Sequence, residues 1–154
     1  MIFKLGMLIA EDNPDDVFMI KRALAKSGLP IKPRFFGDGQ ETLDYLFGKP
    51  PFDNRSIYPL PKLLLLDIKM PSKSGLEVLR DIRNSQPLKH LVAVMFSSSA
   101  ESRDVVRAYD LGANAYVVKP SDCEDLIPIF RRLHEFWFLT NLPAYDVGEE
   151  MPYS

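Results

Sequence analysis

Four consecutive leucines, Leu63 to Leu66, are followed at once by Asp67 and then by Met70-Pro71. A run this apolar is typical of a strand that is buried on both faces, as in the middle of a parallel sheet covered by helices. Asp67 would then stand at the carboxyl end of that strand, where open α/β sheets bind their ligands. The stretch therefore predicts both a fold class and the place of a functional carboxylate.

Four further apolar runs have the length of strands and alternate with segments of helical spacing. The strands are expected at residues 5–10, 31–36, 91–96 and 115–118. Helices are expected over about 13–28, around 43–47, from 76 to before Pro87, over about 101–111 and over about 122–138. Pro33 makes the second run an edge strand, and Pro128 should kink the last helix or mark its first turn. Five strands that alternate with five helices predict an α/β fold, a doubly wound parallel sheet with right-handed crossovers.

Length and composition favour one globular domain, since the chain has 154 residues of which 46% are hydrophobic. We expect this domain to span residues 1–138 and to be followed by a tail, 139–154, that is extended or packed only locally. The net charge of −2 gives no electrostatic reason to expect nucleic-acid or membrane binding. The sequence shows no signal peptide and no stretch long enough to span a bilayer, so a cytoplasmic location is the default expectation.

Polar residues follow four of the five predicted strands: Glu11-Asp12, Asp67, Ser97 and Lys119. In a parallel sheet these positions share one edge. Carboxylates gathered there would repel one another unless a divalent cation lay between them, and all-oxygen ligation with retained water favours Mg²⁺. A lysine beside such a cluster suits a further anion, of which phosphate is the obvious one, and a carboxylate can itself accept a phosphoryl group.

These residues belong to a longer pattern that adds Met70-Pro71, Gly75 and Tyr116-Val117-Val118-Lys119-Pro120. Over about residues 5–138 the chain resembles the receiver domain of two-component response regulators. The resemblance implies a flavodoxin-like sheet of strand order 2-1-3-4-5. It also implies a phosphoacceptor signalling switch, which would catalyse only its own Mg²⁺-dependent phosphorylation and dephosphorylation. The proline-rich loop at 48–61 and the aromatic run at 136–138 are more similar to the single-domain regulators that partner bacterial phytochromes.

By this resemblance Asp67 is the phosphoryl acceptor. Asp12, Asp67 and the backbone carbonyl of Lys69 would bind Mg²⁺, and Glu11 would support the site directly or through water. The metal and Lys119 would neutralise charge on the phosphoryl oxygens during transfer. The phosphoryl group would come from a histidine kinase, of the phytochrome type if the closer resemblance holds, or from a histidine phosphotransfer protein.

The resemblance also implies a switch. Ser97 would hydrogen-bond the phosphoryl group, and Tyr116 would turn inward as Ser97 moves, which would remodel the surface of the fourth helix, fifth strand and fifth helix. Lys69 and Ser99 lie at positions that tune hydrolysis in this family, and Lys69 could shield the phosphoryl group from water. We therefore expect a phosphorylated form that lives longer than that of fast chemotaxis-type regulators. With only 16 residues after residue 138, a DNA-binding module is not expected, so the output would be protein–protein contact or phosphotransfer.

Three other functions fit the fold class. A Mg²⁺-dependent phosphatase with an aspartyl nucleophile generally needs a second carboxylate two residues after the first, where this chain has Lys69. A flavin- or nucleotide-binding domain would need a glycine- or serine-rich phosphate loop, which residues 11–16 do not offer. A degenerate receiver that acts only as a scaffold is disfavoured by the intact Asp67 and Lys119.

The remaining chemically active residues have plainer interpretations. His90 and His134 have no partner at ligand spacing and are expected on the surface or partly packed. Cys123, the only cysteine, can form neither an internal disulfide nor a cysteine-based metal cage, and is expected to be an inert thiol. The aromatic run Phe136-Trp137-Phe138 is expected to seal the core or to form a subunit contact, which would give a homodimer through the C-terminal helix and tail. Three consecutive residues point in different directions on a helix, so at least one should be exposed unless a partner covers it.

Overall fold

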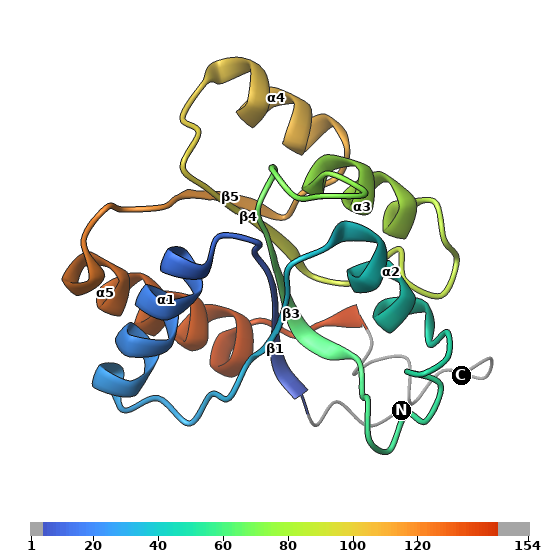
Figure 1. Ribbon diagram of the computed structural model, residues 1–154, viewed down its shortest axis with the longest axis horizontal. Helices are drawn as coiled ribbons and strands as arrows, with labels where there is room; N and C mark the ends of the chain where they lie inside the picture. The colour runs from blue at the N-terminus through green and yellow to red at the C-terminus, as the bar shows by residue number, and fades with distance from the viewer. Residues whose placement is uncertain (1–4, 145–154) are drawn as a thin grey trace.

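The computed structural model describes residues 5–144, and part of the predicted tail, 145–154, lies outside this range. One parallel sheet has the strand order β2-β1-β3-β4-β5, which confirms the predicted topology (Figure 1). The strands are β1 (Leu5–Ala10), β2 (Arg34–Phe36), β3 (Pro61–Leu66), β4 (Ala93–Ser97) and β5 (Ala115–Val118). The helices are α1 (Pro14–Ser27), α2 (Gly39–Phe47), α3 (Gly75–Arg83), α4 (Ser102–Asp110), α5 (Cys123–His134) and the wider π-helical turn η1 (Glu135–Thr140).

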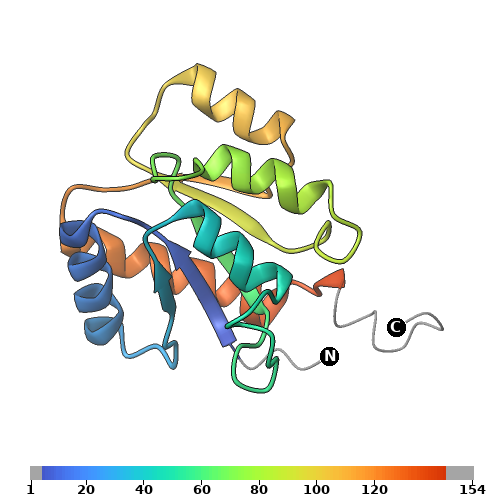
Figure 2. The same cartoon turned by 45° about the vertical axis from the view of Figure 1, so that its right-hand side comes forward.

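The helices form one layer on each side of the sheet. α1 and α5 pack together on one face, and α2 and α3 lie side by side on the other (Figures 1 and 2). The leucine strand β3 separates these layers. Leu64 and Leu66 belong to the core beneath α2 and α3, whereas Leu63 and Leu65 belong to the core beneath α1 and α5. All four are fully buried, so the continuous apolar run reflects burial on both faces.

Local signals place the start of α1 immediately after β1. The side chain of Asn13 accepts hydrogen bonds from the backbone N–H groups of Asp15 and Asp16, and Pro14 occupies the first helical position. Gly28 ends the helix with a φ of 72°, which a glycine adopts without strain. The chain therefore turns directly from the carboxyl end of β1 into α1, and the acidic first turn of the helix stays beside the end of the sheet.

Several elements differ in extent from the prediction: β4 runs over Ala93–Ser97 rather than 91–96, α2 begins at Gly39, and α3 ends at Arg83. β2 covers only Arg34–Phe36 rather than 31–36, because the strand begins after Pro33, which has no N–H to donate. The last helix is α-helical only from Cys123 to His134 and then widens into η1, which ends at Thr140, two residues beyond the predicted boundary. Pro128 lies inside α5 rather than in its first turn.

The predicted division of the aromatic run between core and surface is confirmed within η1. Phe136 is 49% exposed, whereas Trp137 and Phe138 are half-buried against the core beneath α1 and α5. Among residues 5–144, no helix combines the length and the apolar character that crossing a membrane requires.

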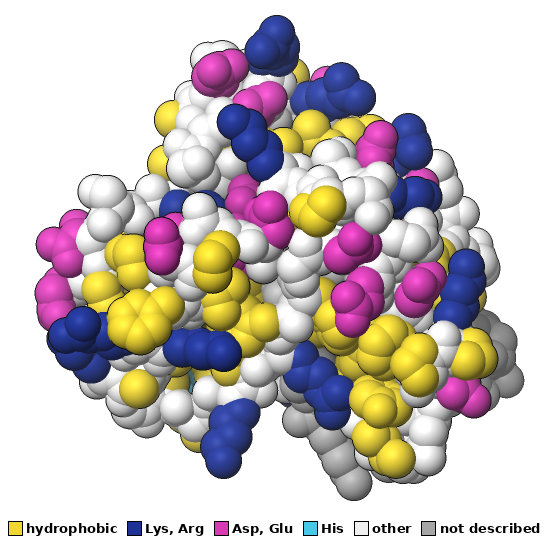
Figure 3. Space-filling view, in the orientation of Figure 1, with side chains coloured by type: hydrophobic (Ala, Val, Ile, Leu, Met, Phe, Trp, Pro, Cys, Tyr) yellow, Lys and Arg dark blue, Asp and Glu magenta, His cyan; other side chains and the backbone are white. Residues whose placement is uncertain are grey.

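The proline-rich segment between α2 and β3 is packed onto its surroundings. Arg55 donates hydrogen bonds to the backbone carbonyls of Tyr45, Leu46 and Tyr58, at 2.7–3.0 Å. The rings of Phe52 and Tyr58 each pack against the ring of Tyr45. Hydrophobic side chains gather over α2 and this segment at the lower right of the molecule (Figure 3). The segment is thus a folded extension of α2 at the amino end of β3.

Candidate functional site

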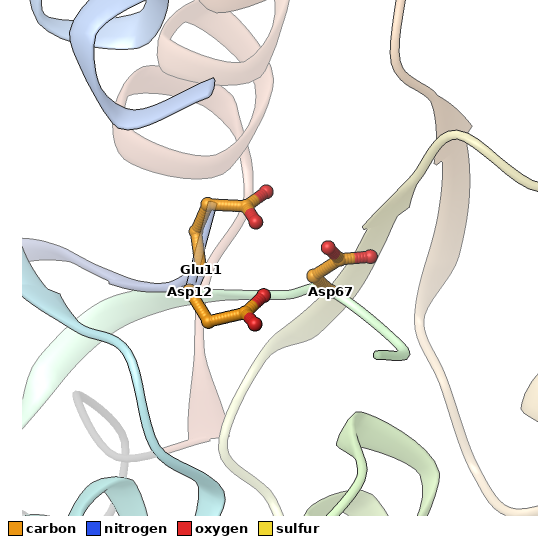
Figure 4. A group of neighbouring side chains, drawn as sticks. All are labelled: Glu11, Asp12 and Asp67. Carbon is orange, nitrogen blue, oxygen red and sulfur yellow. The ribbon is translucent and has the colours of Figure 1, made fainter. Parts of the chain in front are cut away.

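Three carboxylates converge where β1 and β3 end. Ala10 is paired with Leu66 in the sheet, and the backbone N–H of Asp67 donates to the carbonyl of Ala10 at 3.0 Å. The residues that follow the two strands are therefore neighbours. One oxygen from each of Glu11, Asp12 and Asp67 lies within 4.8 Å of the other two, as Figure 4 shows for the side chains. Glu11 and Asp67 are buried and Asp12 is exposed, so the cluster opens to solvent on one side.

Lys119 reaches this cluster from the end of β5. Its backbone N–H donates to the carbonyl of Ser97 at 2.8 Å, which fixes the residue beside the end of β4. The ammonium group donates to Glu11 Oε1 at 2.5 Å, to Asp16 Oδ2 at 2.9 Å and to Asp67 Oδ2 at 3.1 Å. The side chain is only 7% exposed. All three N–H groups of the ammonium thus have a carboxylate partner.

The electrostatics of the site show an excess of negative charge. Burial raises the pKa of Glu11 to about 7, and the charge of Asp67 adds to this rise although the hydrogen bond from Lys119 opposes it. Burial alone would lower the pKa of Lys119, but its hydrogen bonds to Glu11 and Asp16 raise it above the ordinary value for lysine. The ammonium therefore stays charged at neutral pH. Oxygen donors that outnumber the nearby cation suit a hard divalent ion such as Mg²⁺.

The predicted switch residues are connected through Ser99. The buried Ser97 accepts a hydrogen bond at its Oγ from the backbone N–H of Ser99, at 3.2 Å. The half-buried Tyr116 donates from its hydroxyl to the carbonyl of Ser99, at 2.8 Å. Ser99 in turn donates from its Oγ to Asp104 Oδ2 in the first turn of α4, at 2.6 Å. A movement at Ser97 can therefore reach both β5 and α4 through one residue.

The loop after Asp67 is fixed by short contacts. The backbone N–H of Ile68 donates to Asp67 Oδ1, and that of Gly75 donates to the carbonyl of Ile68, both at 2.8 Å. Ser72 donates from its Oγ to Asp38 Oδ2 at 2.6 Å, which ties the loop to the N-terminus of α2. The side chain of Lys69 is exposed in this loop, and metal binding by its carbonyl stays a prediction.

Asp16 is the site residue that sequence reasoning missed. An acidic residue in the first turn of a helix is favoured by the helix dipole alone, yet the carboxylate of Asp16 also contacts Lys119. The sequence offered one indication of this role. Asp16 lies in the first turn of a helix that begins directly after β1, the strand that Glu11 and Asp12 follow. The residues expected to be chemically inactive lie outside the three-carboxylate cluster: His134 packs on Phe138, and the thiol of Cys123 donates weakly to the carbonyl of Met19.

Comparison with known proteins gives a consistent picture. Residues 7–131 match the family model described as the response regulator receiver domain. The response regulator Rcp1 of Synechocystis is 30% identical over 139 residues, which cover 90% of this chain and 92% of Rcp1. A structure of the Mn²⁺-bound form of Rcp1 covers 90% of this chain and 98% of its own, with 28% identity and a TM-score of 0.78.

Two further solved structures are similar in both sequence and fold. A response regulator in red light signaling of R. palustris has 34% identity and a TM-score of 0.85. The phosphorylated cyanobacterial phytochrome response regulator RcpA has 33% identity and a TM-score of 0.81. Each alignment covers 90% of this chain and 97% of the other.

Proposed function

The chain belongs to the response regulator receiver-domain family, and from this premise we propose that Asp67 is its phosphoryl acceptor. The observation that carries the proposal is the position of Asp67. Its carboxylate lies between two further carboxylates and the ammonium of Lys119, at the end of the central strand. This arrangement offers a nucleophilic oxygen together with groups that can neutralise an incoming phosphoryl group.

Glu11, Asp12 and Asp67, with the backbone carbonyl of Lys69, would hold Mg²⁺. When bound, the ion would neutralise part of the negative charge on the transferring phosphoryl group. The surplus of carboxylates over nearby cations supports this assignment, as does the similarity to Rcp1, which has a Mn²⁺-bound structure. The exposed side of the cluster, at Asp12, leaves room for water ligands and for a phosphodonor.

In the proposed reaction one oxygen of Asp67 attacks the phosphorus of the donor. A bond from that oxygen to phosphorus forms as the bond from phosphorus to the donor breaks, and the donor leaves with that electron pair. The product on the protein is a mixed anhydride of the carboxylate and phosphate. Lys119 donates a hydrogen bond to a phosphoryl oxygen through the N–H that it now directs at Asp67. The donor would be a histidine kinase or a phosphotransfer protein, and the similarity to a cyanobacterial phytochrome response regulator supports a phytochrome-type kinase.

The response would start at Ser97. Its hydroxyl would turn to donate to a phosphoryl oxygen and would release the N–H of Ser99. The hydroxyl of Tyr116, in β5, donates a hydrogen bond to the carbonyl of Ser99, and Ser99 donates to Asp104, in α4. This movement would therefore pass to both β5 and α4. Exposed apolar side chains lie on these two elements, at Val106, Tyr109 and Val118, and form a surface that a partner could recognise.

The direct test is incubation with acetyl phosphate and Mg²⁺ followed by intact-mass measurement. We expect the mass to increase by one phosphoryl group, and Asp67→Asn to abolish the increase. Asp53→Asn, in the segment at the opposite end of β3, should leave it unchanged. An unmodified wild-type protein that also fails to bind beryllofluoride would contradict the proposal.

A further inference from the structure

Asp16 contacts the same ammonium group as the proposed acceptor, yet it is not one of the three carboxylates that converge at the metal cluster. It lies in the first turn of α1, and its Oδ2 is 2.9 Å from Lys119 Nζ. The side chain of Asp16 is 35% exposed, whereas that of Lys119 is 7% exposed. The carboxylate of Asp16 therefore lies between the nearly buried ammonium group and the solvent.

The hydrogen bonds of Lys119 divide into two anchors and one directed donor. Glu11, which directly follows β1, and Asp16, in α1, hold the ammonium at 2.5 Å and 2.9 Å. The third and longest contact, 3.1 Å, goes to Asp67. When Asp67 carries a phosphoryl group, Lys119 has to exchange only this third contact for a phosphoryl oxygen. An ammonium group rotates freely unless its other N–H groups are held, so the two anchors decide where the third N–H points.

We propose that Asp16 is a positioning residue that, together with Glu11, holds Lys119 so that one N–H faces the phosphoryl group on Asp67. This inference rests on the proposed acceptor role of Asp67 and assigns to α1 a part in phosphoryl transfer. Asp16 does not touch the reacting atoms and acts through Lys119.

Two opposing effects follow from removing this carboxylate. Loss of a negative charge would favour approach of an anionic phosphodonor, but Asp16 is partly exposed and solvent screens it, so this gain is about two- to threefold at most. Loss of an anchor would leave Lys119 misdirected, and charge-assisted hydrogen bonds position a group more strongly than neutral ones. We expect the second effect to prevail and to slow phosphorylation about tenfold.

Asp15 provides a matched control, because it has the same charge, lies in the same helical turn and is not among the three partners of Lys119. Phosphorylation by acetyl phosphate at saturating Mg²⁺ is compared in wild type, Asp16→Ala, Asp16→Asn and Asp15→Asn. We expect Asp16→Ala to be about tenfold slower than wild type. Asp16→Asn keeps an oxygen acceptor and should fall between the two, and Asp15→Asn should equal or slightly exceed wild type.

A second measurement reports on Lys119 without phosphorylation. In protein labelled with ¹⁵N-lysine, the buried ammonium of Lys119 should give an NMR signal that exchanges slowly with water. Asp16→Ala should speed this exchange about tenfold. Asp15→Asn, which removes the same charge from the first turn of α1, should not.

The outcomes separate the two proposals. If wild type is phosphorylated and Asp16→Ala reacts as fast as Asp15→Asn, or if exchange at Lys119 is unchanged in Asp16→Ala, the role of Asp16 is wrong while the acceptor role of Asp67 stands. If wild type takes up no phosphoryl group, the acceptor role itself is wrong and the role of Asp16 falls with it.

Discussion

Gly75 provides a sharp test of how Asp67, the proposed acceptor, is held in place. It is the first residue of α3, and a Cβ added there would lie 1.9 Å from the carbonyl oxygen of Asp67. Real Cβ atoms do not approach other atoms closer than 3.0 Å, so Asp67 or the start of α3 would have to move by at least 1.1 Å, the difference between these distances. The backbone N–H of Gly75 also donates a hydrogen bond to the carbonyl of Ile68, which limits how far the start of α3 can move away from Asp67.

The expected effects of Gly75→Ala on stability oppose one another. Helix propensity alone would make alanine more favourable by about 1 kcal/mol. Overpacking costs about 1–3 kcal/mol, and a weakened hydrogen bond to Ile68 costs about 1 kcal/mol more. We therefore expect the free energy of unfolding to fall by about 1–3 kcal/mol. A displacement of the acceptor by about 1 Å should slow phosphorylation by about 100-fold.

Urea unfolding and the rate of phosphorylation by acetyl phosphate with Mg²⁺ measure both effects. Gly37→Ala is the control, since a Cβ at Gly37 would lie an ordinary 3.5 Å from the Cα atom of Asp12, which follows β1 rather than β3. It should leave the phosphorylation rate close to that of wild type. A Gly75→Ala variant that is more stable than wild type and is phosphorylated at the wild-type rate would refute the steric reasoning.

Two further predictions concern stability away from the acceptor. Arg55→Ala removes the hydrogen bonds to the carbonyls of Tyr45, Leu46 and Tyr58 and should lower the free energy of unfolding by about 2–3 kcal/mol in urea titrations. Phosphorylation of the folded variant should be unchanged, because this segment lies at the opposite end of β3 from Asp67 (Figure 1); a slowed rate would contradict this. The hydrogen bond from Lys73 holds the pKa of Asp81 in the folded protein below its ordinary value of 3.8. The ion pair therefore stabilises the fold fully above pH 3.8, and this stabilisation is lost as the pH falls through the pKa of Asp81 in the folded protein. Asp81→Asn should therefore be less stable than wild type by about 0.5 kcal/mol at neutral pH, and the difference should shrink in acid; a constant difference would exclude the ion pair as its cause.

The sequence was sufficient to predict the sheet and the convergence of Glu11, Asp12, Asp67 and Lys119 at its end, because the signals there are local. The leucine run marks the buried strand by itself, and polar residues directly after strands identify the functional edge once the sheet is parallel. Asp16 could not be assigned in this way. Its partner Lys119 is 103 residues away, and only the placement of α1 beside the end of β5 brings the two together.

The segment between α2 and β3 illustrates a second limit. Its prolines predict a long loop, and the segment forms neither helix nor strand, but its packing depends on Arg55 reaching back to the end of α2. The end of α5 is similar. Helical spacing of apolar residues continues through Phe138, yet the backbone changes from an α-helix to a π-helix after His134. Apolar side chains of both segments pack on the core beneath α1 and α5, so the sequence pattern does not distinguish the two helix types. In both places tertiary contacts decide a geometry that periodicity leaves open.

The charges at the end of the sheet explain why a cation should precede the phosphoryl group. When Glu11, Asp12, Asp16 and Asp67 are all ionised, Lys119 leaves three of the four negative charges uncompensated within one small region. A phosphodonor is itself an anion, and like charges a few ångströms apart in a partly buried site repel strongly. The pKa of Glu11, raised to about 7 by burial and by Asp67, shows that the cluster already resists carrying its full charge. A divalent ion would bring the region close to neutrality, so the proposed need for Mg²⁺ follows from the same carboxylates that surround the proposed acceptor.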